Sequence, residues 1–299
     1  MQTLYTLSSS EQLDASKPEI PDRILNEKLE HVLDIFTVAV LYSIKIAQYA
    51  STDAQNRSFK YLRSDEDLNV NTSIADNTFV RKIATNASFI EKVKAAKLDR
   101  FLDEEWVKKI YQQLIKTEQY LKYIGNNAPS PAEQKDIIRF IWEKQILENE
   151  GLVSYFNDEL PGWEDDAELI GMLMQNFFNG SAKVNFMDLL SGEKRAYAHE
   201  LLHAVLDKKD YCMELIEPKL KNWDKDRVAL IDLLLLRMGV CELLYFPTIP
   251  TKVSINEYID IAKQYSTPQS GQFVNGVLDN ILKDLLKENK IKKTDRQNN

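Results

Sequence analysis

The chain has 299 residues, 44% of them hydrophobic and 28% charged, which predicts a globular protein with one or two domains. Its two cysteines exclude a disulfide framework, and its longest apolar run near the start, residues 35–44, is too short to span a bilayer. The net charge of −8 is uneven: residues 191–299 sum to +1 and residues 1–190 to −9, so only the first part repels a nucleic acid. Because the start shows no signal peptide, we expect a cytoplasmic protein without a membrane segment.

Glycine and proline are sparse, nine of each, and the segments between them repeat apolar residues three and four positions apart. This pattern predicts an all-α protein. The chain begins with a helix that ends near Ser8, and a loop with Pro18 and Pro21 follows. A long amphipathic helix is predicted over residues 24–50, and a polar loop follows over residues 51–77. Three further helices are predicted over residues 78–94, 98–124 and 131–149.

Gly151 and Pro161 mark a linker between the two halves of the chain. After it, a helix is predicted over residues 164–178, another begins at Gly192, and a third covers residues 211–223.

The segment 227–244 is too hydrophobic for a surface helix, so we expect it at the centre of a C-terminal bundle. Asp224 or Asp226 can cap its start, and Phe246 and Pro247 stop it.

Ser254 and Glu257 have the spacing of a capping box, which predicts that they satisfy the first backbone N–H groups of the next helix. Ser270 and Gly271 mark the turn before the last helix. Within that helix, Gly276 permits a close approach of neighbouring backbone.

Residues 196–205 read AYAHELLHAV and contain H-E-x-x-H, the pattern in which two histidines one helical turn apart bind zinc. A zinc enzyme needs a third protein ligand. One class of zinc peptidases has a glycine and a histidine three and six positions after the second histidine, but this chain has Leu206 and Lys209 there. Glu242 is the least implausible third donor. Because three fixed positions match often by chance, we interpret His199 and His203 as a helix surface and predict no metal ligand and no catalytic residue. A zinc hydrolase is the least favoured function.

Residues 227–282 read RVALIDLLLLRMGVCELLYFPTIPTKVSINEYIDIAKQYSTPQSGQFVNGVLDNIL. With Pro-Thr-Lys-Val-Ser-Ile-Asn-Glu at 250–257 and Phe-Val-Asn-Gly-Val-Leu-Asp at 273–279, this stretch resembles the NusB family of bacterial transcription antitermination factors. The resemblance covers about the last hundred residues, and residues 1–5 are similar to the latter part of the family's first helix. The length resembles that of long, Bacteroidetes-like members.

The resemblance implies an all-α fold, a NusB-like pair of helical bundles with a long helical insertion after the first helix. It also implies a non-enzymatic, RNA-binding factor that recognises the boxA element of nascent ribosomal RNA. The family does so together with NusE, the small-subunit ribosomal protein, in the transcription elongation complex, and no cofactor is expected. We expect residues 1–190 to form the first helix and the insertion, and residues 191–299 to form the C-terminal bundle.

The matched motifs place candidate RNA-binding residues around the last two helices. They are Lys252, Asn256, Gln272, Phe273 and Asn275. An aromatic side chain beside a helix N-terminus can stack on an unpaired base while backbone N–H groups meet phosphate, although Phe273 fits a core position equally well. Lys252 and Lys263 are the nearest matched cations. Arg237 and Glu242 are the candidate contacts to the protein partner.

One departure concerns the arginine-rich segment that precedes the family's first helix and contacts RNA. Here the first arginine is Arg23, so we expect the reading frame to extend upstream of Met1. The alternative function is a helical protein-interaction module that has lost RNA binding.

Overall fold

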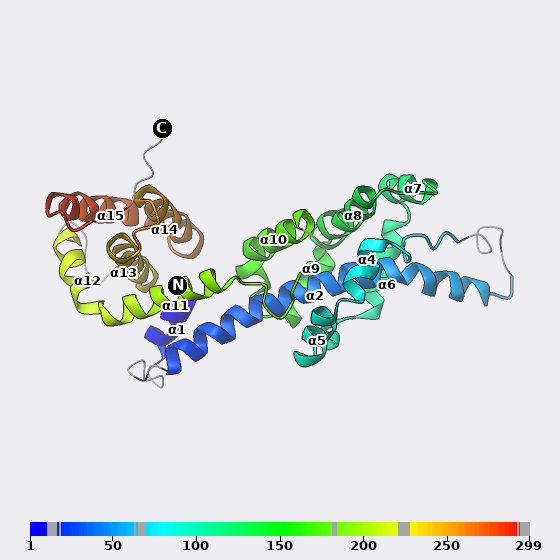
Figure 1. Ribbon diagram of the computed structural model, residues 1–299, viewed down its shortest axis with the longest axis horizontal. Helices are drawn as coiled ribbons and strands as arrows, with labels where there is room; N and C mark the ends of the chain where they lie inside the picture. The colour runs from blue at the N-terminus through cyan, green and yellow to red at the C-terminus, as the bar shows by residue number, and fades with distance from the viewer. Residues whose placement is uncertain are drawn as a thin grey trace. The chain divides into compact units, whose positions relative to one another are not determined.

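The structure is a computed structural model, and it describes residues 1–10, 17, 19–62, 64, 70–180, 184–220, 228–291 and 293. All regular secondary structure in these ranges is helical, which confirms the all-α prediction (Figure 1). None of the described helices is both long and apolar enough to cross a membrane.

The chain divides into two compact units. Unit 1 comprises residues 1–28 and 190–299, and unit 2 comprises residues 29–189. The first residues belong with the C-terminal part because Leu4 and Leu7 are buried in its core. Compactness does not test whether either part folds alone, so the domains 1–190 and 191–299 stay a prediction.

Unit 1 is built around one apolar helix, α13 (Leu230–Tyr245), which is buried without interruption from residue 234 to residue 243. The helices that contact it are α1 (Gln2–Ser9), α11 (Gly192–Asp207), α12 (Lys209–Ile216), α14 (Thr251–Tyr265) and α15 (Ser270–Lys287). A 3₁₀ turn, Glu217–Leu220, follows α12. The predicted central position of this helix is therefore confirmed.

The start of α13 differs from the prediction. The helix begins at Leu230, with Ala229 at its N-cap position and without a side-chain cap. The predicted caps, Asp224 and Asp226, lie outside the described residues. Phe246 ends the helix as predicted.

Unit 2 contains most of α2 (Glu19–Ser58), whose residues between 35 and 50 are almost all buried. Further helices pack around it. They are α4 (Thr78–Ala84), α5 (Ala87–Ala95), α6 (Glu104–Leu114), α7 (Glu118–Gly125), α8 (Pro131–Phe140), α9 (Glu150–Glu159) and α10 (Trp163–Asn179), with a 3₁₀ turn at Leu98–Phe101 and a π-helical turn at Ile141–Ile146.

Helix α2 is longer than predicted at both ends. It begins at Glu19, and Pro21 lies in its first turn, where a missing backbone N–H costs nothing because that group has no intrahelical acceptor. At the other end the helix continues through a polar segment to Ser58, and Arg57 Nε donates to Asp53 Oδ2 over 2.8 Å. The predicted loop of residues 51–77 is therefore wrong in its first eight positions.

Helix α9 was not predicted, because Gly151 was read as part of a linker. Asn149 caps the helix by accepting a hydrogen bond from the Leu152 N–H over 3.0 Å. A Cβ on Gly151 would lie 2.6 Å from Cη2 of Trp106, so the glycine lets α9 pack closely against α6.

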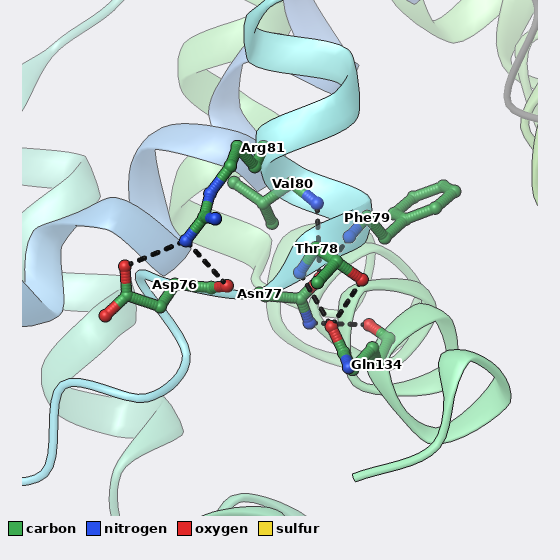
Figure 2. Close-up of polar contacts among 7 residues, drawn as sticks. All are labelled: Asp76, Asn77, Thr78, Phe79, Val80, Arg81 and Gln134. Atoms are coloured by element: carbon green, nitrogen blue, oxygen red, sulfur yellow. Dashed lines mark hydrogen bonds and ion pairs between the residues drawn. The ribbon is translucent and has the colours of Figure 1, made fainter. Parts of the chain in front are cut away.

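Asn77 fixes the start of α4 and also ties it to α8 (Figure 2). Its Oδ1 accepts hydrogen bonds from the N–H groups of Phe79 and Val80, over 2.9 and 3.2 Å. Its Nδ2 donates to the carbonyl of Gln134 over 2.7 Å, and Oε1 of Gln134 accepts from the N–H of Thr78 over 2.6 Å. This exchange gives α4 both its N-cap and its position on α8.

Close helix contact in unit 1 depends on Gly239 and not on Gly276. A Cβ on Gly239 would lie 2.8 and 2.9 Å from the two methyl carbons of Leu278 and 3.3 Å from Cδ2 of Tyr258. At Gly276 an added Cβ would meet no atom within 4 Å. The predicted role of Gly276 is wrong, because that position faces away from the neighbouring helices.

The two glycines make a matched pair of substitutions. We expect Gly239→Ala to lower the free energy of unfolding by about 1–3 kcal/mol, since the side chains around it are buried and must move apart. Gly276→Ala removes a glycine from an exposed helical position and should raise that free energy by up to about 1 kcal/mol. Urea unfolding followed by circular dichroism measures both, and equal effects would contradict the assignment.

Candidate functional site

Helix α14 carries two of the candidate RNA-binding residues on its exposed side. Lys252 and Asn256 lie one helical turn apart and both are exposed. Among the described residues, Lys252 has no ion-pair partner. Its charge therefore faces solvent.

The start of α14 corrects the predicted capping box. The helix begins at Thr251, so Ser254 is already inside it and its N–H donates to the Pro250 carbonyl over 3.1 Å. The side chain of Ser254 is fully buried, and Glu257 is exposed. The serine therefore faces the core and does not cap the helix.

The three candidate RNA-binding residues in the first two turns of α15 differ in exposure. Gln272 and Asn275 are exposed and share one face, because they are three positions apart. Phe273 is only 5% exposed and belongs to the unit 1 core. Of the two roles left open for this phenylalanine, the structure places it in the core.

Lys263 of α14 lies beside the start of α15. A Cβ on Gly271 would stand 2.9 Å from Cγ of Lys263, so the lysine stem crosses the position that the glycine leaves free. The ammonium is exposed and forms an ion pair with Asp260 over 2.8 Å. The structure therefore adds Lys263 to the neighbourhood of Gln272.

The candidate surface has two ends. Lys252 and Lys263 are eleven positions apart on one helix, which corresponds to about 16 Å along its axis. Gln272 lies near the Lys263 end, while Asn256 lies one turn from Lys252. The two ends are therefore too far apart for one nucleotide to contact both.

A buried hydroxyl fixes the start of α15. Ser270 Oγ donates to Asp232 Oδ2 of α13 over 2.8 Å, and both side chains are buried. The same oxygen accepts from the Thr267 N–H over 3.2 Å. These contacts hold the turn between α14 and α15 on α13, a role that the sequence did not indicate for either residue.

The two candidate partner contacts are buried, with exposed fractions of 6% for Arg237 and 4% for Glu242. Arg237 Nη2 donates to the Val205 carbonyl over 2.8 Å, which joins α13 to α11. Glu242 Oε1 accepts from the hydroxyls of Tyr197 and Tyr258, the latter over 3.3 Å. Both residues therefore hold helices together inside unit 1 and are not on its surface.

The two histidines of H-E-x-x-H meet a carboxylate that the sequence reading missed. Asp22, on the part of α2 that belongs to unit 1, has its Oδ1 2.8 Å from His199 Nδ1 and 2.9 Å from His203 Nε2. The other ring nitrogen of His199, Nε2, is 3.1 Å from Oδ1 of Asn26. Glu242, the donor considered from sequence, belongs to the tyrosine cluster instead.

Comparison with known proteins identifies relatives of the C-terminal part of the chain. The sequence profile described as "NusB family" matches residues 163–283. A Geotalea daltonii protein named "Transcription antitermination protein NusB" is 39% identical over 129 residues, which cover 41% of this chain and 87% of that one. A Salinibacter ruber protein of the same name is 48% identical over 102 residues, or 34% of this chain and 64% of that one. The chain thus matches somewhat less than two thirds of the Salinibacter protein.

A solved structure, "T. maritima NusB", is 29% identical and covers 42% of this chain and 92% of its own, with a TM-score of 0.30. The region matched by the family profile, residues 163–283, runs from the start of α10 into α15 and begins before the predicted boundary at residue 190.

The tyrosine cluster generates a test of stability. Tyr258→Phe leaves the buried carboxylate of Glu242 with one donor fewer, so we expect the free energy of unfolding to fall by about 1–3 kcal/mol. Tyr5→Phe, at a position 43% exposed, is the matched control and should change little. Urea unfolding at pH 7 measures both.

The same pair of variants tests a pH dependence. Burial raises the pKa of Tyr258 well above its ordinary value of 10, and the nearby negative charge of the Glu242 carboxylate raises it further. The unfolded chain therefore loses the tyrosine proton first, and stability that is complete below about pH 10 falls as the pH rises further. We expect Tyr258→Phe to show a smaller loss between pH 9 and 11 than the unsubstituted protein, and an identical loss would contradict this assignment.

Proposed function

Because this chain belongs to the NusB family, we propose that it is an RNA-binding transcription antitermination factor. It recognises the boxA element of nascent ribosomal RNA together with NusE, the small-subunit ribosomal protein, within the transcription elongation complex and hence in the cytoplasm. The observation that carries the proposal is the long match to relatives named as antitermination proteins, 39% identical with 87% of the relative covered in one case. The function requires no catalytic residue and no cofactor.

The exposed side of α14 and α15 offers suitable chemistry for single-stranded RNA. Asn256, Gln272 and Asn275 carry amides that can donate to and accept from the edges of unpaired bases. Lys252 and Lys263 supply charge for phosphate contacts. Since Phe273 is buried, base recognition here depends on the amides and not on stacking by that ring.

Two features make the exposed side of α14 and α15 suitable for binding RNA. The turn before α15 is held to α13 by Ser270 and Asp232, so the exposed amides follow a fixed helix start. The segment 191–299, which contains both helices, has a net charge of +1, whereas residues 1–190 sum to −9. A polyanion therefore meets less repulsion at this segment than elsewhere.

Titration of labelled boxA RNA at several salt concentrations, with and without NusE, tests the proposal. We expect affinity that rises when NusE is added and exceeds that for a scrambled RNA. Lys252→Ala and Lys263→Ala should each weaken binding and reduce the slope of log K against log salt by about 0.7, the value for one phosphate contact on a single strand. Gln272→Ala and Asn275→Ala should reduce the preference for boxA and leave the slope unchanged.

Lys283→Ala is the matched control, because this lysine is exposed and ion-paired to the same degree as Lys263 but lies on α15 two turns or more from the candidate amides. Its slope should equal that of the unsubstituted protein. Binding that is indifferent to RNA sequence and to NusE would favour the alternative, a helical interaction module without RNA recognition.

A further inference from the structure

The site formed by Asp22, His199 and His203 has the composition and the spacing of a metal site. The three possible ligand atoms, one carboxylate oxygen and two imidazole nitrogens, all lie within 4.8 Å of one another. Two bonds of about 2.1 Å from a tetrahedral ion separate their ligand atoms by roughly 3.4 Å. The observed separations of 2.8 and 2.9 Å from Asp22 Oδ1 need to open by only about half an ångström.

The position of His199 gives a second, independent reason. Its Nε2 lies 3.1 Å from Oδ1 of the Asn26 side chain, so Asn26 contacts the ring nitrogen that does not face Asp22. Metal-binding histidines commonly use their second ring nitrogen for such a hydrogen bond, which fixes the orientation of the ring. Nδ1, 2.8 Å from Asp22 Oδ1, is then the nitrogen that can bind a metal ion.

Access and ligand count also agree with ion binding. The side chains of His199, His203 and Asp22 are 29%, 38% and 37% exposed, so an ion and a water molecule can reach the site. Three protein ligands leave the fourth position of a tetrahedral ion for water. Two imidazoles and a carboxylate favour zinc and similar transition metals, whereas Mg²⁺ and Ca²⁺ prefer oxygen ligands alone.

We propose that Asp22, His199 and His203 bind one divalent transition-metal ion, and Zn²⁺ is a suitable probe of this class. The ion joins the start of α2 to α11 within unit 1. Asp22 is 177 positions from His199 and 181 positions from His203 in the chain, so the bound ion links two segments that are far apart in sequence.

The test uses the full chain, freed of metal with EDTA, dialysed and then titrated with Zn²⁺ by calorimetry and by thermal unfolding. We expect one ion per chain and an unfolding temperature that rises with Zn²⁺ concentration. Mg²⁺ should have no such effect. Asp22→Asn, which keeps the size of the side chain, and His203→Gln should each weaken Zn²⁺ binding at least tenfold.

Two control variants should bind Zn²⁺ like the unsubstituted protein. His31→Gln removes the remaining histidine, which is in unit 2 beside the Pro161 carbonyl. Cys212→Ser removes one thiol of the buried pair whose sulfur atoms are 3.4 Å apart.

Equal Zn²⁺ affinity in His203→Gln and the unsubstituted protein would overturn the proposal. So would variants that lower the unfolding temperature by the same amount with and without Zn²⁺, because the three side chains would then act only through their hydrogen bonds. Circular dichroism in EDTA confirms that each variant is folded, which keeps either result interpretable.

Discussion

The arrangement of unit 1 depends on the burial of α13. Residues 234–243 of this mostly apolar helix are all buried, so no side of this stretch remains in water and other helices have to cover it all round. Five helices do so. Gly239 allows α14 and α15 to come so close to α13 that Tyr258 and Leu278 lie next to the α13 backbone. The candidate RNA surface is the outer side of the two helices that this packing brings together.

Burial of apolar surface does not by itself select one arrangement of the covering helices, since it is non-directional. The polar side chains on α13 provide direction. Asp232 accepts from Ser270 of α15, Arg237 donates to the Val205 carbonyl of α11, and Glu242 accepts from tyrosines of α11 and α14. A displaced helix would leave one of these buried groups without its partner, which is costly in the interior. The polar groups therefore specify which helix lies where.

The sequence was sufficient for the fold class, the central helix and the family, because these depend on periodicity, on a long apolar run and on a dense set of matched motifs. It was insufficient where one residue has two structural uses. Gly151 and Pro21 were read as breaks although both lie within helices, and the spacing of Ser254 and Glu257 suited a cap that the helix does not use. Arg237 and Glu242 were predicted to contact the protein partner, which requires exposed side chains, because charge in a sequence does not reveal burial. Asp22 was missed because only the tertiary structure brings it to the histidines, which are far from it in the chain.

Unit 1 is discontinuous, with residues 1–28 and 190–299 separated by the whole of unit 2. During synthesis the apolar side chains of α1 therefore emerge long before α11 and α13 exist to cover them. At ordinary translation rates about 160 residues take roughly 8–30 s to add, which is far longer than the collapse of a chain segment. The ribosome thus imposes an order of assembly, in which the intervening unit is complete before the first helix meets its permanent neighbours.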